Sequence, residues 1–390
     1  MAAKKNNYND ELDKRYVART LELAKKAEGF ASPNPIVGAV VVKNGKIVGE
    51  GWHEKAGMPH AEVMALNKAG KEAEGATIYV SLEPCSHFGQ TPPCVSKIKE
   101  SGIRRVVAAV SDPNPLVAGK GFEYLMDAGI EVKYGILEKE AEKLNESFFK
   151  YISTGMPFIT LKNALTLDGK IGYKKNKGVC YISSKESLKY THHLRLLNDA
   201  IMVSANTVIC DNPSLDVRLL NAGTKKKFLS KKYVKIVLDP DLSVPLNSKI
   251  FTTHGSVLIF TSPQYNEDKK EKLKLLREKG AVIQDVSYKE IKGKKFLNLP
   301  EVLKKCAEMK ITSILVEPGQ KLFASLISQN LFDKLIFNLT PDMIGEEKGL
   351  GLFDELSLGL KDKIKLTGLE IKKIRDEIFL TYYNGVSKIK

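Results

Sequence analysis

The sequence predicts two α/β domains that meet near residue 150. The chain has 390 residues, which is long enough for two domains of ordinary size. Apolar segments of strand length alternate with amphipathic segments of helix length, and they do so in two successive series. The turn-rich segment STGMP at 153–157 separates the two series, so we expect domains over 8–152 and 153–390.

The first series opens and closes with a helix. Val17, Leu21 and Ala24 recur at helical spacing within residues 11–28. Residues 36–42 are typical of a buried strand, and the Asn-Gly pair that follows predicts a tight hairpin turn into a strand over 46–49. The pattern then predicts helices over 60–69, 95–101, 121–128 and 138–151, and strands over 77–82, 106–110 and 130–134. Strands that alternate with helices favour a largely parallel sheet.

The second series has a different strand spacing, and no internal repeat relates it to the first. It begins with a strand over 158–165. We expect further strands near 200–203, 234–238, 257–260, 314–317 and 335–339, and helices near 185–195, 266–279, 300–309 and 321–329. No G-x-G-x-x-G follows the first strand, which argues against a Rossmann dinucleotide fold. The sequence therefore predicts two unrelated folds.

Composition excludes several classes of protein. Hydrophobic residues make up 43% of the chain and charged residues 27%, as in proteins that build a core, so disorder is not expected. The apolar run 36–42 is far shorter than the roughly 18 residues of a membrane span. Residues 1–15 lack the apolar core of a secretory signal, and five cysteines in such a chain favour a reducing compartment. We expect a cytoplasmic protein with no membrane partner.

The net charge of +15 lies almost entirely in the second series, because residues 1–150 carry 21 Lys and Arg against 20 Asp and Glu. We interpret Lys225–Lys227, Lys231 and Lys232 as an exposed loop. A functional reading of the basic excess is attraction of a small phosphorylated ligand. Arginines and interleaved aromatic residues are too few for a nucleic-acid surface, so we expect no nucleic-acid partner. We separately expect a homo-oligomer of this chain.

His60, Cys85 and Cys94 form a candidate metal site. A catalytic zinc takes three protein ligands and keeps one position open for water, and one His with two Cys meets that count. Glu62 is then placed to take a proton from the activated water and to pass it to a leaving amine. The H-x-E and P-C pattern is the signature of zinc deaminases. The first domain is therefore expected to use Zn2+ for hydrolytic deamination.

The cysteine spacing leaves other interpretations open. Eight residues separate Cys85 from Cys94, where most zinc deaminases have C-x-x-C. A structural zinc domain would need a fourth protein ligand, and His87 is the nearby candidate. A tRNA-editing deaminase with a basic binding domain is the rival enzyme, but the long loop and the near-neutral first part argue against it. One degenerate half is a further alternative.

Three segments of the first domain resemble the deaminase half of the bifunctional riboflavin-biosynthesis deaminase/reductase family: PNPIVGAVVV (33–42), GWHEKAGMPHAE (51–62) and EPCSHFGQTPPC (83–94). The resemblance implies a cytidine-deaminase-like α/β/α domain. It would remove the 2-amino group of a diaminopyrimidinone that carries a phosphoribosylamino substituent. The substrate contacts that it implies are Asn34, His53, His87, Asp112 and Asn114. Gln90 departs from the Lys or Arg that is usual in the family, so a phosphate contact there would lose its charge.

The second domain resembles the reductase half of the same family over residues 157–385, although its own signal is weak. The segment 314–328 reads as strand, glycine and helix, a pattern that can bind phosphate. The resemblance implies a dihydrofolate-reductase-like domain that uses NADPH to reduce the ribosyl side chain to ribityl. Lys162 would be catalytic, and Arg195 and Arg218 would bind the substrate phosphate. The implied substrate contacts are Arg195, Asp211, Leu215, Arg218 and Glu317.

The resemblance also implies a set of cofactor contacts, with departures. The contacts are Leu165, Tyr181, Thr207, Gly319, Gln320, Lys321, Leu322, Phe323, Ala324 and Ser325. Tyr181 replaces a common Trp and keeps an aromatic face, whereas Val179 replaces a Ser and removes a hydrogen-bonding group. Pro318 replaces the first glycine of the usual E-G-G. Because it has no N–H, the phosphate-binding turn loses one possible hydrogen-bond donor.

Overall fold

The computed structural model describes residues 2–86, 92–114, 117–173, 181–263, 266–291, 293–357 and 363–385. His87, Gln90 and Val179 lie outside this part of the chain. The chain divides into two compact units, Met1–Gly155 and Met156–Lys390. In the part that the structure describes, no helix is both long enough and apolar enough to cross a membrane.

The first unit is built on a five-stranded sheet of order β2-β1-β3-β4-β5. The strands are β1 (Gly38–Lys43), β2 (Lys46–Trp52), β3 (Thr77–Val80), β4 (Arg105–Ala108) and β5 (Glu131–Lys133). Strands β3, β4 and β5 are parallel, while β1 is antiparallel to both β2 and β3. The predicted hairpin turn is confirmed: Asn44 and Gly45 have φ of 50° and 75°, as a tight turn between β1 and β2 requires.

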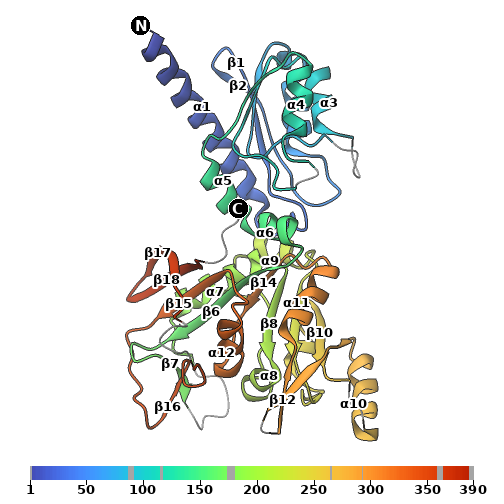
Figure 1. Cartoon of the computed structure of the whole chain (residues 1–390), viewed down its shortest axis with the longest axis vertical. Helices are drawn as coiled ribbons and strands as arrows, with labels where there is room; N and C mark the ends of the chain where they lie inside the picture. The colour runs from blue at the N-terminus through green and yellow to red at the C-terminus, as the bar shows by residue number, and fades with distance from the viewer. Residues whose placement is uncertain are drawn as a thin grey trace. The chain divides into compact units, whose positions relative to one another are not determined.

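Helices cover both faces of this sheet, which gives three layers (Figure 1). The helices packed on one face are α1 (Ala2–Ala24), α5 (Glu138–Leu144) and α6 (Glu146–Thr154). Those on the opposite face are α2 (Ala61–Ala69), α3 (Cys94–Glu100) and α4 (Lys120–Asp127). The alternation of side chains explains the layers, because Val40 and Val42 of β1 face α1 whereas Ala39 and Val41 face α2.

The single helix predicted over 138–151 is wrong, because the chain breaks it into α5 and α6 at Asn145. The backbone of Asn145 leaves helical geometry, with φ −112° and ψ 22°. Its side chain is buried, where Oδ1 accepts from the N–H of Ile36 at 2.8 Å and Nδ2 donates to the carbonyl of Ile36 at 3.0 Å. This tertiary pairing ties the helix pair to the segment that leads into β1, and no local pattern encodes it.

The second unit contains a nine-stranded sheet of order β11-β10-β9-β8-β14-β6-β15-β18-β17. Its parallel strands are β11 (Val282–Asp285), β10 (Ser256–Thr261), β9 (Val234–Leu238), β8 (Ala200–Ser204), β14 (Ser313–Val316), β6 (Phe158–Leu165) and β15 (Lys334–Leu339). Strands β18 (Glu377–Asn384) and β17 (Leu366–Ile374) extend it antiparallel. Two separate ribbons pair β12 (Tyr288–Ile291) with β13 (Lys294–Leu297) and β16 (Gly349–Gly351) with β7 (Lys170–Tyr173).

Both faces of the larger sheet carry helices. On one face, α11 (Leu299–Glu308) and α12 (Gln320–Ser328) enclose the main core with apolar residues of β6, β9, β10 and β14. On the other face, α7 (Lys185–Leu197) packs Leu194 against Leu315, Ile336 and Phe379. The remaining helices are α8 (Ala205–Asp211), α9 (Ala222–Phe228) and α10 (Glu267–Glu278).

Part of the lysine-rich segment that we interpreted as an exposed loop is helical, although Lys225–Lys227 are exposed and Lys231 and Lys232 lie outside the helix. Lys225–Lys227 lie in α9, which begins where the Asn221 side chain accepts from the N–H of Thr224 at 2.8 Å. The helix is held by buried Phe228, whose ring contacts Tyr233 and His254. Lys231 is not a freely solvated side chain, because its ammonium donates to the carbonyls of Leu196 and Asn198 at the end of α7, both at 2.7 Å.

Candidate functional site

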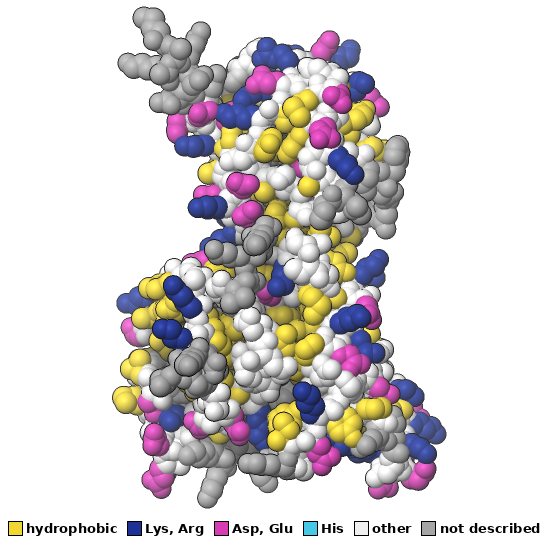
Figure 2. Space-filling view, in the orientation of Figure 1, with side chains coloured by type: hydrophobic (Ala, Val, Ile, Leu, Met, Phe, Trp, Pro, Cys, Tyr) yellow, Lys and Arg dark blue, Asp and Glu magenta, His cyan; other side chains and the backbone are white. Residues whose placement is uncertain are grey.

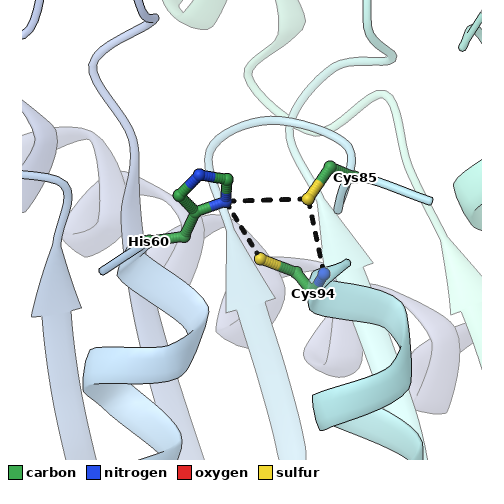
Figure 3. A group of neighbouring side chains, drawn as sticks. All are labelled: His60, Cys85 and Cys94. Carbon is green, nitrogen blue, oxygen red and sulfur yellow. Dashed lines mark hydrogen bonds between the residues drawn. The ribbon is translucent and has the colours of Figure 1, made fainter. Parts of the chain in front are cut away.

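The three predicted metal ligands converge in the first unit (Figure 3). Nδ1 of His60 lies 3.2 Å from Sγ of Cys94 and 3.6 Å from Sγ of Cys85, and the three ligand atoms lie within 4.8 Å of one another. Zinc–sulfur bonds of about 2.3 Å and zinc–nitrogen bonds of about 2.0 Å fit such a triangle. The donor set and its spacing therefore suit a zinc ion with a fourth position left for water.

Local structure explains this convergence. His60 stands immediately before α2 and Cys94 is the first residue of α3, so both ligands sit at helix N-termini. The N–H of Cys94 donates to Sγ of Cys85 at 3.3 Å, which directs the second sulfur toward the same point. Gly51 lets β2 approach the start of α2, because a Cβ there would lie 2.4 Å from the carbonyl oxygen of Ala61.

The electrostatics favour a thiolate at the site. Hydrogen bonds from Cys94 and His60 outweigh burial and lower the pKa of Cys85 to about 4. The hydrogen bond with Cys85 raises the pKa of His60. An anionic sulfur beside an imidazole nitrogen is the ligand chemistry that zinc prefers.

Glu62 lies in the first turn of α2 and is buried, with 4% of its surface exposed. Burial and the neighbouring Cys85 charge raise the pKa of its carboxyl group. The group of metal-ligand atoms consists of His60, Cys85 and Cys94 and does not include this carboxylate. Glu62 therefore lies beside the metal ligands without being one of them, which fits the role of a general acid/base better than that of a ligand.

Asn34 and His53, two of the predicted substrate contacts, are brought together. Nε2 of His53 lies 3.1 Å from Nδ2 of Asn34, and Nδ1 of His53 lies 3.2 Å from the carbonyl oxygen of Pro59. The amide must donate to Nε2, so the imidazole carries its proton on Nδ1. Burial lowers the pKa of His53, which keeps this ring neutral. The His53 ring also stands edge-on to His60 at 5.3 Å between centroids.

Asp112 and Asn114 lie in the loop after β4, and their arrangement involves a residue that the sequence analysis missed. Oδ1 of Asp112 accepts from the N–H of Asn114 at 2.8 Å, which forms a local turn. Glu83 is buried, and its Oε2 accepts from the N–H of Asp112 at 3.1 Å. A single glutamate has no diagnostic spacing, so nothing in the sequence marked Glu83 as functional apart from its place in the EPC motif.

In the second unit, Lys162, Arg195 and Glu317 come from three neighbouring elements. Lys162 lies on β6, Glu317 directly follows β14, which pairs with β6, and Arg195 lies in the last turn of α7. Nε and Nη2 of Arg195 each donate to one oxygen of Glu317 at 2.8 Å, and Nη1 donates to the carbonyl of Asp216 at 3.2 Å. Burial lowers the pKa of Lys162, while the Glu317 charge opposes this.

Arg218 has a different environment. Its Nη1 donates to Oδ1 of Asp216 at 2.6 Å, and its side chain is 43% exposed. The backbone N–H of Arg218 donates to Nδ1 of buried His192 at 3.1 Å. Burial and the Arg195 and Arg218 charges lower the pKa of His192 to about 4, so the ring is neutral and able to accept this bond.

The remaining predicted substrate contacts, Asp211 and Leu215, lie at the end of α8 and in the loop that follows it. Burial raises the pKa of Asp211. Leu215 has φ of 50° and only 1% of its surface exposed, so its side chain belongs to the interior. The left-handed backbone of a buried leucine is uncommon and marks a constrained loop.

The predicted cofactor contacts divide into exposed and buried groups. Tyr181 is 59% exposed, and Oγ1 of half-buried Thr207 lies 3.3 Å from Oγ of Ser204. The residues whose side chains are buried are Leu165, Leu322, Phe323 and Ala324. In α12, Lys321 is exposed and Gln320 and Ser325 are half-buried, so these side chains and the backbone of the first turn are accessible to a ligand.

The start of α12 nevertheless suits a nucleotide phosphate. Gly319 caps the helix without a side-chain hydrogen bond, and the first turn contains no acidic residue. The N–H groups in the first turn of a helix point along its axis and favour an anion. Pro318 lacks an N–H, but its carbonyl accepts from Nδ2 of Asn163 at 2.7 Å, which anchors the turn before Gly319. The Gln320 side chain contacts Gly351 and Asp354 and thereby ties α12 to the β16 segment.

A second polar group near Lys162 was also missed by the sequence analysis. Nδ2 of Asn338 on β15 donates to Oε2 of Glu377 at 2.6 Å and to Oγ of Ser183 at 3.0 Å. Glu377 is buried, and its charge raises the pKa of Lys162 against the effect of burial. These residues belong to β15, β18 and the segment before α7, so only the sheet order brings them together.

Basic side chains do not form an uninterrupted surface where Figure 2 shows them most densely. Over α10, Lys and Arg side chains gather with acidic side chains among them. Ion pairs such as Lys270 with Glu267 and Lys269 with Asp241 explain this mixture. A mixed surface of this kind favours solubility over a nucleic-acid track on this face.

Family models match both halves of the chain. Residues 10–110 match the zinc-binding region of cytidine and deoxycytidylate deaminases. Residues 157–380 match the RibD C-terminal domain.

Similar proteins cover nearly the whole chain. The riboflavin biosynthesis protein RibD of Aquifex aeolicus is 45% identical over 95% of this chain and 98% of the relative. RibD of Escherichia coli is 38% identical over 86% of this chain and 89% of its own length.

Solved structures agree with the sequence relatives. RibD of Acinetobacter baumannii superposes with a TM-score of 0.84 and 33% identity, covering 96% of this chain and 99% of that one. The diaminohydroxyphosphoribosylaminopyrimidine deaminase/5-amino-6-(5-phosphoribosylamino)uracil reductase of Thermotoga maritima gives a TM-score of 0.81 at 33% identity, with the same coverage.

Proposed function

Since the chain belongs to the RibD family of bifunctional riboflavin-biosynthesis proteins, we propose that its two described sites carry out the two reactions of that family in turn. It is a zinc-dependent deaminase and an NADPH-dependent reductase, with a cytidine-deaminase-like unit and a dihydrofolate-reductase-like unit. The first reaction removes the 2-amino group of 2,5-diamino-6-(5-phosphoribosylamino)pyrimidin-4-one, and the second reduces the ribosyl side chain of the product to ribityl. Family membership rules out the tRNA-editing alternative.

The observation that carries the deaminase assignment is the triangle of His60, Cys85 and Cys94 with Glu62 buried beside it. Zinc, when bound, supplies a Lewis acid that activates water for attack on the pyrimidine carbon. We assign Glu62 the proton transfer: its carboxylate accepts a proton from the attacking water and returns it to the departing amine. The buried position of Glu62 excludes bulk water from competing in this transfer.

We assign Asn34, His53, Asp112 and Asn114 to the pyrimidine, and the hydrogen-bond pattern supports this assignment. His53 fixes the Asn34 amide through Nε2, so Oδ1 of Asn34 points away from that bond and can accept from an amino group of the pyrimidine. Asp112 and Asn114 supply further polar groups from the loop after β4. His87 stays a prediction, as it lies outside the described residues.

In the reductase unit, NADPH supplies the hydride. We assign Lys162 the proton that the ribose needs as it opens, and Arg218 the contact with the substrate phosphate. The Arg195–Glu317 pair, close to Lys162, supports a role in shaping this site. The phosphates of the cofactor are assigned to the N-terminal turn of α12 because that turn has no side-chain cap and no acid.

We assign residues 8–152 to the deaminase and 153–390 to the reductase, and the division of the chain between Gly155 and Met156 supports this boundary. Free Cys85, Cys94, Cys210 and Cys306 support a reducing location such as the cytoplasm. A small phosphorylated pyrimidine is the expected partner. A homo-oligomeric state stays a prediction.

Separate assays of the two half-reactions test the proposed function. Chelation of zinc is expected to abolish deamination and to leave reduction of the supplied deaminated intermediate unchanged. Glu62→Gln is expected to keep about one zinc per chain, because only three protein ligands are needed, while deamination falls roughly 10²- to 10⁴-fold. Zinc content by atomic spectroscopy and rates of both half-reactions provide the measurements.

The matched control is Glu72→Gln, which changes an exposed glutamate a short distance along the chain and should match the wild type. Loss of zinc from Glu62→Gln would show that this residue is a ligand. If chelation stopped both reactions without unfolding the protein, the division into two independent sites would be wrong.

A further inference from the structure

Glu83 is a buried carboxylate that holds backbone groups from a distant part of the chain. It is 4% exposed and follows β3, two positions before the metal ligand Cys85. Its Oε2 accepts from the N–H groups of Asp112 at 3.1 Å and Gly119 at 3.0 Å, and its Oε1 accepts from the N–H of Gly121 at 2.9 Å. Three N–H donors from one segment therefore satisfy a single carboxylate.

The segment that Glu83 holds is shaped to reach it. Gly119 has φ of 80°, in the left-handed region that favours glycine, and it immediately precedes α4. A Cβ on Gly121 would lie 2.2 Å from the carbonyl oxygen of Pro84 and 3.0 Å from Oε1 of Glu83. The two glycines thus let the start of α4 close on the carboxylate, where the helix dipole also favours a negative charge.

The same segment carries the polar groups assigned to the pyrimidine. Glu83 binds the N–H of Asp112, and the carboxylate of Asp112 binds the N–H of Asn114. A continuous chain of hydrogen bonds therefore runs from the strand that leads to Cys85 to both assigned substrate contacts. Charge-assisted bonds to N–H groups are among the stronger hydrogen bonds, and such chains restrict the groups that they join.

We propose that Glu83 is a positioning residue of the deaminase: by holding the backbone of Asp112, whose carboxylate binds the N–H of Asn114, it sets Asn114 at the correct distance from the metal ligands for the pyrimidine. The proposal rests on the assignment of Asn114 as a substrate contact under the proposed function. A purely structural role would affect folding and zinc binding. A positioning role affects recognition of the substrate and acts through Asn114.

The test uses the full-length zinc-loaded enzyme and Glu83→Gln. We expect the deaminase KM to rise about tenfold or more while kcat changes far less, because recognition and not proton transfer is lost. Zinc content and reductase activity should match the wild type, and the variant should stay folded at the assay temperature, although its melting temperature should fall because the NH2 of Gln cannot accept from a backbone N–H. Glu123→Gln is the matched control, because Glu123 is an exposed carboxylate in the first turn of the same helix α4.

A double-mutant cycle separates positioning from a structural effect. In an Asn114→Ala background, Glu83→Gln should cause no further rise in KM, because the contact that it positions is already gone. Glu83→Asp provides the same cycle if Glu83→Gln does not fold. Glu83→Asp, which keeps the charge with a shorter reach, should recover part of the loss.

Two results would overturn the proposal, and they can be told apart. If Asn114→Ala raises KM but Glu83→Gln multiplies that rise, Glu83 does not act through Asn114, and the proposed function survives. If Asn114→Ala leaves KM unchanged, the assigned substrate contact is wrong, and the role of Glu83 falls with it.

Discussion

Arg195 and Glu317 form a two-pronged ion pair in the reductase unit, with both nitrogen–oxygen distances at 2.8 Å. The side chains are 11% and 22% exposed, so the pair is largely removed from water. The third guanidinium nitrogen is bound to the carbonyl of Asp216. The guanidinium nitrogens of Arg195 that could bind a phosphate are therefore already hydrogen-bonded within the protein. Arg218, in contrast, keeps a partly exposed guanidinium.

Arg218→Ala is the variant that tests phosphate binding. A charge-assisted bond contributes roughly 1.5–3 kcal/mol, so reductase kcat/KM should fall about 10- to 150-fold while deamination is unchanged. Arg277→Ala, which removes an exposed arginine from α10, is the control. If the wild type reduces a dephosphorylated substrate equally well, Arg218 does not bind phosphate.

Arg195→Ala should behave differently, because it leaves the Glu317 carboxylate buried without its partner. Removal of one member of a buried pair typically costs about 3 kcal/mol or more, so the free energy of unfolding should fall by about that amount. Urea unfolding followed by circular dichroism compares this variant with Arg218→Ala, which should be near wild-type stability. Equal stability for the two variants would contradict a structural role for Arg195.

A buried ion cluster at Asp13 predicts acid sensitivity of the deaminase unit. Asp13 is 1% exposed and accepts from Arg105 at 2.8 and 2.9 Å, Lys133 at 2.9 Å and Tyr79 at 3.0 Å. Burial raises the pKa of Asp13, but these hydrogen bonds outweigh it and lower the pKa below its usual value of 3.8. The cluster ties α1 to β3, β4 and β5.

The sign of the pH effect follows from that lowered pKa. The ionised carboxylate stabilises the folded unit above the unfolded pKa, and this stabilisation is lost as pH falls through the folded pKa. Asp13→Asn should therefore lower the free energy of unfolding by about 3 kcal/mol at pH 7. Below pH 3.8 the difference in stability between wild type and variant should disappear. Trp52 fluorescence follows this unit, because the chain contains a single Trp. A gap that persists at low pH, or an equal loss in exposed Asp127→Asn, would contradict the prediction.

Parts of the molecule encoded by local patterns could be predicted from the sequence. The alternation in β1, the Asn44-Gly45 turn and the motifs around His60 and Cys85 are short-range signals with a direct physical cause. The C-terminal hairpin of β17 and β18 was missed because β17 is an edge strand whose apolar Leu369 and Ile371 are exposed, so no buried face marked it.

Contacts between residues far apart in the chain could not be predicted from the sequence. Asn145 breaks a helix because its side chain binds Ile36, and Glu83 matters because three N–H groups from the next crossover segment meet it. The engagement of Arg195 by Glu317 has the same origin, since α7 and β14 are far apart in the chain. Residue type identified these side chains as polar, but only the fold determined their partners.

Lys162 predicts the pH dependence of the reductase. Burial lowers the pKa of its ammonium below the usual 10.5, even though the Glu317 charge favours the protonated form. If Lys162 donates the proton to the opening ribose, reductase kcat/KM must fall as pH rises through this lowered pKa. Lys162→Met should lose roughly 10²- to 10⁴-fold in rate at neutral pH, with deamination unchanged.

Lys162→Arg provides the sharper test, because a guanidinium stays charged across the accessible pH range. Its rate should be lower than that of the wild type, yet the decline at high pH should disappear. Lys348→Met removes an exposed lysine of the same unit and should keep the wild-type profile. If Lys162→Arg retains the high-pH decline, the titrating group is another residue or the substrate, and the proton must come from elsewhere in the site.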